Sequence, residues 1–178
     1  AFTSVEDHRF FQHNGVDWLR TGRAVIEYFF GKGDFGGSTI TQQLVKNLTE
    51  NNENSVQRKI QEIFRALHLE KEMSKEDILE MYLNIVFLGN NCYGVQAAAN
   101  TYFDKDVSEL TISESAVLAA TTKAPYTINP IVNPEANAER REYVLLNMYE
   151  NGHITKTEYD EALADDVYAR IQNNAAAN

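Results

Sequence analysis

The chain has 178 residues, a formal net charge of −10 and a pI near 4.8. This acidic balance argues against nucleic acid as a partner, because binding to phosphate backbones depends on basic surface. It also disfavours purely electrostatic attachment to an anionic membrane. The length and the 43% content of apolar residues suffice for one domain with a buried core, and a single cysteine excludes an internal disulfide.

Helical spacing of apolar residues dominates the chain, and the alternation typical of strands is almost absent. We therefore predict an all-α, mainly helical domain over residues 1–171, followed by a disordered tail at 172–178. Most of the predicted helices begin with serine, threonine or asparagine, whose side chains accept hydrogen bonds from free helix N–H groups. In chain order the predicted helices cover residues 4–11, 17–30, 38–48, 55–71, 74–89, 94–103, 111–124, 133–152 and a last one from 155.

The polar run from Glu6 to Gly15 supplies a carboxylate pair, Glu6 and Asp7, and the imidazole of His13. These groups suit an enzyme site. Acidic residues in a first helical turn also favour the helix dipole, so a purely structural role for Glu6 and Asp7 remains open. His13 is equally compatible with a hydrogen-bonded structural histidine. A metal cluster is not indicated, because His8 and His13 are not at the i, i+4 spacing that places two ligands on one helix face.

A second polar run, from Gly36 to Asn47, combines hydroxyl, amide and ammonium groups on one short stretch. A helix start offers free N–H groups, and flanking glycines permit close approach of an anionic ligand. A capped surface helix would explain Ser38 and Lys46 separately, but it does not explain the adjacent glutamines Gln42 and Gln43. The spacing of glycine and lysine is not that of a P-loop.

The predicted helix after Ser55 has an apolar stripe that we expect in the core, made up of Val56, Ile60, Ile63 and Leu67. Glu62 lies on another face, with Arg58 and Arg65 at helical spacing. These charges are compatible with a solvated face held by an i, i+4 ion pair. They are also compatible with a carboxylate held between cations beside an anionic ligand, with Lys59 at its flank.

Two apolar segments remain. Residues 78–88 are apolar nearly all round and predict a central buried helix, in which Tyr82 and Asn84 need partners. The apolar residues between Trp18 and Phe30 are more often core than lipid contacts, but an exposed apolar surface next to the glycine-rich loop is the open alternative. No stretch approaches the roughly 20 apolar residues of a membrane-spanning helix.

The motifs together resemble glycosyltransferase family 51, the peptidoglycan glycosyltransferase domain of class A penicillin-binding proteins and monofunctional transglycosylases. Five segments follow the family's order over about residues 2–165: Glu6 to Gly15, Gly37 to Asn47, Arg58 to Glu62, Ile78 to Asn84 and Arg141 to Met148. The resemblance implies a lysozyme-like, two-lobed helical fold. It also implies polymerisation of lipid II into β-1,4-linked glycan, with inversion and release of undecaprenyl diphosphate.

By this resemblance Glu6 is the general base, and Glu62 is a second catalytic glutamate that supports the donor diphosphate, with a divalent cation (Mg²⁺ or Mn²⁺) as a possible ligand. No organic cofactor is implied. The implied substrate-binding residues are Asp7, Phe10, His13, Ser38, Thr39, Gln42, Gln43, Lys46, Asn47, Arg58 and Lys59. The implied ligands are lipid II, the growing glycan strand and the inhibitor moenomycin.

The resemblance places the activity at the outer face of a bacterial cytoplasmic membrane. Family members usually carry a transmembrane helix ahead of the first motif. We therefore expect an excised domain whose membrane contact relies on an anchor outside this sequence and on apolar residues around Trp18 to Phe35. A transpeptidase domain in the parent protein is a further possibility. The segment from Leu48 to Asn54 is acidic and polar where many members are basic, so extra phosphate contacts are not expected there.

Two competing functions remain open at this stage. A lysozyme-like lytic enzyme would share the helical fold and a catalytic glutamate, but it has no need of a phosphate-holding set. A non-catalytic glycan-binding or partner-binding module would not require both Glu6 and Glu62.

Overall fold

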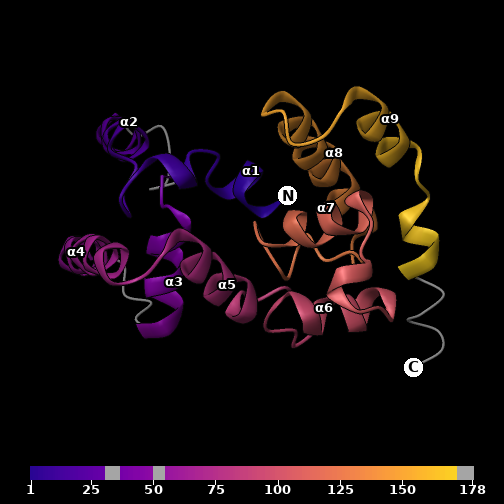
Figure 1. Cartoon of the computed structure of the whole chain (residues 1–178), viewed down its shortest axis with the longest axis horizontal. Coiled ribbons are helices and arrows are strands. Elements are labelled where there is room, and N and C mark those ends of the chain that lie inside the picture. The colour runs from indigo at the N-terminus through magenta and orange to yellow at the C-terminus, as the bar shows by residue number, and fades with distance from the viewer. Residues whose placement is uncertain (31–36, 50–54, 172–178) are drawn as a thin grey trace. The chain divides into compact units, whose positions relative to one another are not determined.

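A computed structural model describes residues 1–30, 37–49 and 55–171 (Figure 1). Within these ranges no strand forms, and the one extended pairing is an isolated bridge between Phe87 and Tyr93. The all-α prediction is therefore confirmed. The helices are α1 Phe2–Glu6, α2 Trp18–Phe29, α3 Ile40–Thr49, α4 Val56–Glu72, α5 Lys75–Ile85, α6 Val95–Phe103, α7 Ile112–Thr121, α8 Pro134–Glu150 and α9 Lys156–Ala164, with 3₁₀ turns η1 Phe10–Gln12 and η2 Val107–Glu109.

The chain divides into two compact units. Unit 1 combines Ala1–Val5 with the residues from Asn84 onward, and unit 2 is Glu6–Leu83. Every residue predicted to bind substrate or to act in catalysis belongs to unit 2. The predicted disordered tail at 172–178 lies outside the described residues, as does the segment 50–54 of the acidic stretch.

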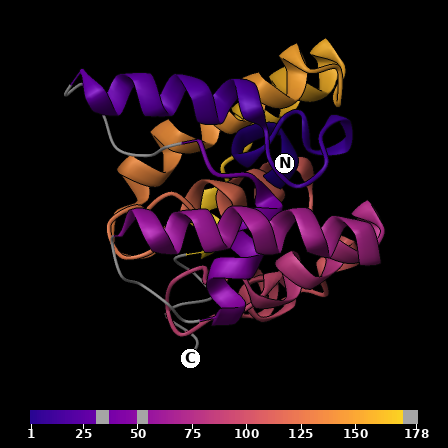
Figure 2. The same ribbon diagram turned by 90° about the vertical axis from the view of Figure 1, so that its left-hand side faces the viewer.

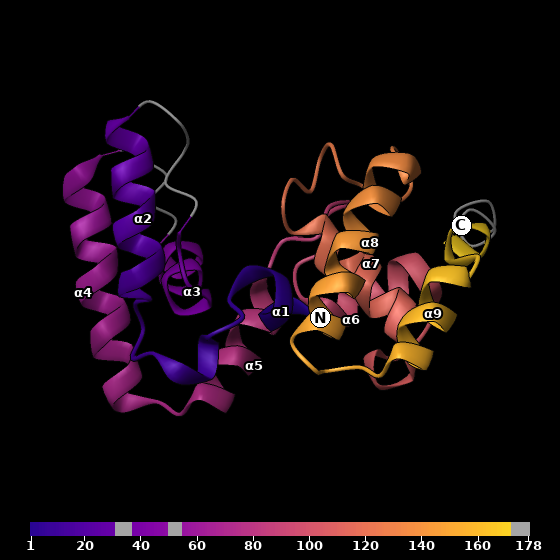
Figure 3. The ribbon, with the colours of Figure 1, turned by 90° about the horizontal axis from the view of Figure 1, so that it is seen from above.

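Unit 1 is built around the alanine-rich helix α7, which packs against α8 and α9 (Figure 3). Small side chains on α7, such as Ala116 and Ala120, are completely buried and let the helices approach closely. Val144 and Leu145 of α8 complete this core, and Phe2 of α1 packs against it.

In unit 2, α3 packs across α4, as Figure 2 shows. The contact buries Ile40 and Leu44 of α3 and Ala66 of α4. Because Gly15 approaches the backbone of Ala66 so closely that a Cβ would lie 2.7 Å from its carbonyl oxygen, the loop before α2 is held directly against α4. The first polar run and α4 are thereby brought together.

Four helices begin directly after a predicted capping residue. The hydroxyl of Ser55 accepts from Arg58 N, and Asn133 caps α8, which has proline at its first turn. Thr111 and Thr155 form complete capping boxes with glutamates three residues later. Helix ends were predicted less well: the helix predicted to reach residue 89 ends at Ile85.

The first predicted helix is wrong in its bounds. α1 ends at Glu6, and Ser4 lies buried inside it instead of capping it. The next residue, Asp7, lies beyond the helix, and its carboxylate accepts a hydrogen bond from Ile40 N at the start of α3. A long-range contact that sequence spacing does not reveal therefore ends the helix.

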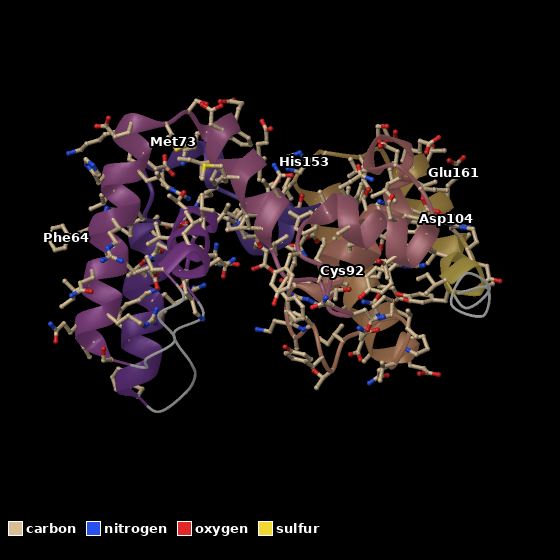
Figure 4. The ribbon with its side chains drawn as sticks, turned by 90° about the horizontal axis from the view of Figure 1, so that it is seen from below. Phe64, Met73, Cys92, Asp104, His153 and Glu161 are labelled. Atoms are coloured by element: carbon tan, nitrogen blue, oxygen red, sulfur yellow. The ribbon has the colours of Figure 1, made fainter. Side chains whose placement is uncertain are left out.

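The predicted core stripe of α4 is wrong in its first half. Val56 and Ile60 are 71% and 49% exposed, whereas Ile63 and Leu67 are partly buried. Phe64, which lies outside the predicted stripe, is 68% exposed and projects away from the helix in Figure 4. The inward face instead carries Glu62 and Ala66. A buried carboxylate is tolerated there because hydrogen-bond donors and cations surround it.

Several apolar residues of α2 face solvent as well, namely Trp18, Leu19 and Ile26, with Phe30 just beyond the helix. The open alternative of an exposed apolar surface is therefore the one observed for these residues. The side chains of Val25 and Phe29 lie outside what the structure describes. Across residues 1–30, 37–49 and 55–171, no helix combines the length and apolar character that crossing a membrane requires.

A buried carboxylate in unit 1 gives a prediction about stability. Burial alone would raise the pKa of Glu114, but hydrogen bonds from Lys105 and from Thr111 N, with the charges of Lys105 and Arg170, lower this pKa below its usual range. We expect Glu114→Gln to lower the free energy of unfolding by about 2 kcal/mol at pH 7, because it leaves Lys105 without its carboxylate partner and Arg170 with Asp165 alone.

Since the folded-state pKa is depressed, this contribution is fully present above the unfolded pKa of about 4.3 and is lost as pH falls through the folded value. Urea unfolding at pH 7, 5.5 and 4 should therefore show a constant difference between wild type and variant that shrinks only at the lowest pH. The exposed Glu139→Gln on α8 is the control. A difference that grows on acidification would contradict this account.

Candidate active site

Glu6 ends α1 and is held from two sides. Its Oε2 accepts a hydrogen bond from Gln43 Nε2 at 3.0 Å, and its backbone carbonyl accepts one from Arg20 Nη1 at 2.8 Å. The side chain is only partly buried. A fixed, partly accessible carboxylate is suited to accept a proton from a substrate hydroxyl.

Gln43 is itself oriented by a buried tyrosine. The Tyr82 hydroxyl donates to Gln43 Oε1 at 3.2 Å, which directs the amide nitrogen of Gln43 toward Glu6. Burial first, and then the negative charge of Glu6, raise the pKa of Tyr82, so its hydroxyl stays protonated as a donor. The sequence predicts only that Tyr82, a polar residue inside an apolar helix, needs a partner, and it does not predict that the partner is Gln43.

Asp7 and His13 form the support under this segment. Asp7 is completely buried, and it accepts from Ile40 N at 3.0 Å and from His13 Nε2 at 3.0 Å. Because His13 Nδ1 accepts from Gly15 N at 3.2 Å, the ring proton lies on Nε2 and is donated to Asp7. The negative charge of Asp7 also favours the N-terminus of α3. Both residues thus position backbone in this structure.

The start of α3 is a capping box made by Thr39 and Gln42. Thr39 Oγ1 accepts from Gln42 N at 3.1 Å, and Gln42 Oε1 accepts from Thr39 N at 3.0 Å. The Thr39 hydroxyl donates to the Gly15 carbonyl at 2.7 Å. This leaves Gln42 Nε2 free to donate to Glu62 Oε1 at 3.2 Å.

Glu62 lies within a cluster of donors on the buried face of α4. Arg58 Nη1 donates to its Oε2 at 2.8 Å, and Lys59 Nζ donates to its Oε1. Lys59 also donates to Ser38 Oγ at 2.7 Å. The sequence prediction of a carboxylate between cations is confirmed for Arg58 and Lys59. Arg65, expected on the same side, is exposed and lines an apolar pocket of about 570 Å³ between α3 and α4.

The residues around Glu62 do not fit a divalent cation held by the protein. Both carboxylate oxygens already accept hydrogen bonds from positively charged groups, which would repel a metal ion. Within residues 1–30, 37–49 and 55–171 no three histidine, cysteine or acidic side chains are grouped to bind a metal. The site offers positive charge from side chains to an anionic ligand.

Three predicted residues lie apart from this hydrogen-bonded set. Lys46 and Asn47 are exposed on the last turn of α3, and Lys46 forms no ion pair with any residue that the structure describes. Phe10 is completely buried, with the Lys75 ammonium 4.4 Å from its ring centroid. Phe10 therefore belongs to the core of unit 2, whereas Lys46 remains accessible to a ligand.

The two glutamates are connected through consecutive residues of one helix. Gln43 contacts Glu6 and Gln42 contacts Glu62, so the first turns of α3 fix both carboxylates in one rigid frame. This explains the glutamine pair that a surface helix left unexplained. A family model described as transglycosylase matches residues 1–149 of the chain. The chain belongs to the transglycosylase family.

Curated relatives agree with this family. The chain is 47% identical over 159 residues to penicillin-binding protein 1F of Bacillus subtilis, covering 89% of this chain and 22% of that protein. It is 42% identical over 170 residues to penicillin-binding protein 1A of Escherichia coli, covering 95% of this chain and 20% of that protein. The sequence thus spans about a fifth of the length of these relatives.

Among solved structures, penicillin-binding protein 1A from Haemophilus influenzae is similar to this chain, with a TM-score of 0.50 and 38% sequence identity. The similarity covers 71% of this chain and 16% of that protein. The helical fold is therefore similar to part of this penicillin-binding protein 1A. Both glutamates lie in the part of the chain that the transglycosylase model matches.

Proposed function

We propose that this transglycosylase domain polymerises lipid II into β-1,4-linked glycan strands and releases undecaprenyl diphosphate. The observation that carries the proposal is the pairing of a partly accessible carboxylate, Glu6, with a separate cluster of cations around Glu62, both held by α3. Glycosyl transfer from a diphosphate needs a base for the attacking hydroxyl and positive charge for the leaving group.

In this mechanism Glu6 accepts the proton of the sugar 4-hydroxyl as its oxygen attacks the anomeric carbon of the donor. The bond to the diphosphate breaks on the opposite face, so the α linkage becomes β, by analogy with inverting glycosidases. Arg58 and Lys59 stabilise the negative charge that develops on the diphosphate, and Lys46 contributes to binding of the donor diphosphate. Ser38 and Gln42 keep the cluster around Glu62 in place.

The exposed apolar residues suggest how unit 2 meets its lipid-linked substrate. Trp18, Leu19 and Ile26 on α2, with Val56 and Phe64 on α4, face solvent. We propose that they contact the outer leaflet of the cytoplasmic membrane, beside an anchor and a transpeptidase domain contributed by the parent protein. Apolar contact suits an acidic chain, whose charge weakens attraction to anionic headgroups.

The test is incubation of the purified protein with lipid II in detergent, once with Mg²⁺ and once with EDTA. Glycan strands that a β-1,4-glycan hydrolase degrades would support the proposal, and moenomycin should suppress them. Release of reducing ends from finished peptidoglycan, without strand synthesis, would favour the lytic alternative. Strand synthesis in EDTA is expected, because the residues around Glu62 supply positive charge themselves.

Lys46→Ala gives a prediction about donor binding. Because Lys46 is exposed and contributes a point charge, we expect its loss to raise the KM for lipid II about tenfold, with a smaller effect on kcat. Steady-state polymerisation kinetics measure both constants. Lys71→Ala removes an exposed lysine of α4 in the same unit and is the matched control. An unchanged KM for Lys46→Ala would remove this residue from the donor site.

A further inference from the structure

Unit 1 carries an exposed aromatic cluster that the proposed chemistry does not use. It consists of Phe87, Tyr93 and Tyr126, with ring centroids 5.0 Å apart between Phe87 and Tyr93 and 5.4 Å apart between Phe87 and Tyr126. Tyr93 is 63% and Tyr126 78% exposed. Two exposed tyrosines therefore pack against one partly buried phenylalanine.

The first two rings belong to a tight hairpin after α5. Gly94 N donates to the Val86 carbonyl at 2.8 Å, and Leu88 N donates to the Cys92 carbonyl at 2.9 Å. The labelled Cys92 marks this hairpin in Figure 4. At its tip Asn90 and Asn91 adopt positive φ of 44° and 58°, a conformation that asparagine tolerates better than most residues. The exposed asparagine side chains thus lie between the two aromatic positions in the sequence.

Buried polar groups lock this hairpin to the segment that carries Tyr126. Asn129 Nδ2 donates to Asn90 Oδ1 at 3.1 Å, and the Tyr102 hydroxyl donates to the Leu88 carbonyl at 2.7 Å. A Cβ on Gly89 would lie 2.6 Å from Asn129 Nδ2. The backbone under the aromatic cluster is therefore fixed before any ligand arrives, which lowers the entropic cost of binding.

We propose that the aromatic cluster binds the β-1,4-linked glycan product, with sugar rings stacked on Tyr93 and Tyr126. Tyrosine offers a rigid apolar ring with a polar tip at low conformational cost. The neighbouring amides of Asn90 and Asn91 can form hydrogen bonds with hydroxyl and N-acetyl groups. This inference rests on the proposed function, because the polymer is the product of that reaction.

A lipid surface fits the aromatic cluster less well. The exposed residues within three positions of Tyr93 and Tyr126 in the sequence are polar, namely Asn90, Asn91, Lys123 and Thr127. Burying these groups in acyl chains would cost free energy, whereas a hydroxylated polymer satisfies them. On α4, by contrast, exposed apolar side chains recur at every fourth residue of one helix face, at Val56, Ile60 and Phe64.

The experiment titrates the whole chain with the β-1,4-linked hexamer of N-acetylglucosamine, without lipid II, and measures the Kd by calorimetry. Wild type should bind, and Tyr93→Ala and Tyr126→Ala should each weaken binding about tenfold, which corresponds to about 1.4 kcal/mol. Tyr126→Phe keeps the ring and should stay within about twofold of wild type. Tyr143→Ala, which removes another exposed tyrosine of unit 1, should leave the Kd unchanged.

The inference would be overturned if wild type did not bind the hexamer, or if the two alanine variants bound it as tightly as wild type. The inference would also be overturned if the alanine variants still bound the hexamer but no longer bound uncharged phosphatidylcholine vesicles. That result would assign the aromatic cluster to lipid binding. Thermal melting of each variant excludes misfolding as the cause. Because the titration contains no lipid II, hexamer binding without polymerisation would refute only the proposed function, and polymerisation without hexamer binding would refute only this inference.

Discussion

Glu6→Gln should lower the rate of lipid II polymerisation by about 10³-fold, within the range that a general base contributes. Glutamine keeps the shape of the side chain, and its carbonyl oxygen can still accept from Gln43 Nε2, which lies 3.0 Å from Glu6 Oε2. The substitution therefore removes the proton acceptor and preserves the contact. Since Glu6 is only partly buried, the melting temperature should change by no more than about 2 °C.

The measurement compares initial rates of strand formation at saturating lipid II with thermal melting of the same preparations. Glu76→Gln, on the first turn of α5 in the same unit, makes the same chemical change at an exposed position and should keep the wild-type rate. Polymerisation by Glu6→Gln near the wild-type rate would contradict the assignment of Glu6 as the general base. A large fall in melting temperature would instead assign Glu6 a structural role.

Local signals in the sequence predicted much of the fold. Capping residues such as Ser55, Thr111 and Thr155 act through contacts within four residues, so a short stretch of sequence is enough to predict them. The cation pair around Glu62 is local in the same sense, because Arg58 and Lys59 lie one helical turn away. These features could be predicted without knowing how the helices pack.

Contacts between distant segments could not be predicted in this way. The stripe that begins with Val56 and Ile60 is the most apolar face of α4, yet Glu62 faces inward because Gln42, 20 residues earlier, supplies a donor. Asp7 is an equivalent case, since its partner Ile40 N is 33 residues away. A prediction from hydrophobic periodicity assumes that the apolar face of a helix is the buried one. The prediction fails where a polar network is buried on another face of the same helix.

Glu62→Gln is expected to have the second largest effect, a fall of about 10²-fold in the polymerisation rate. The amide that replaces the carboxylate leaves Arg58 and Lys59 without a counter-charge and turns a donor toward one of them. The two cations then repel one another and no longer hold the orientation in which they face the diphosphate. We also expect the free energy of unfolding to fall by about 2 kcal/mol, because breaking a buried charge pair leaves groups unsatisfied.

A double-mutant cycle with Lys59→Met separates these two effects. If Glu62 stabilises the fold through Lys59, the combined variant should lose less stability than the two single losses added together, by at least about 0.5 kcal/mol. Activity should not recover with it, because the cation that stabilises the leaving diphosphate is still missing. Recovery of both stability and rate in the double variant would show that Glu62 only balances the charge of Lys59. Recovery of stability alone would show that Lys59 acts on the diphosphate in addition to its pairing with Glu62.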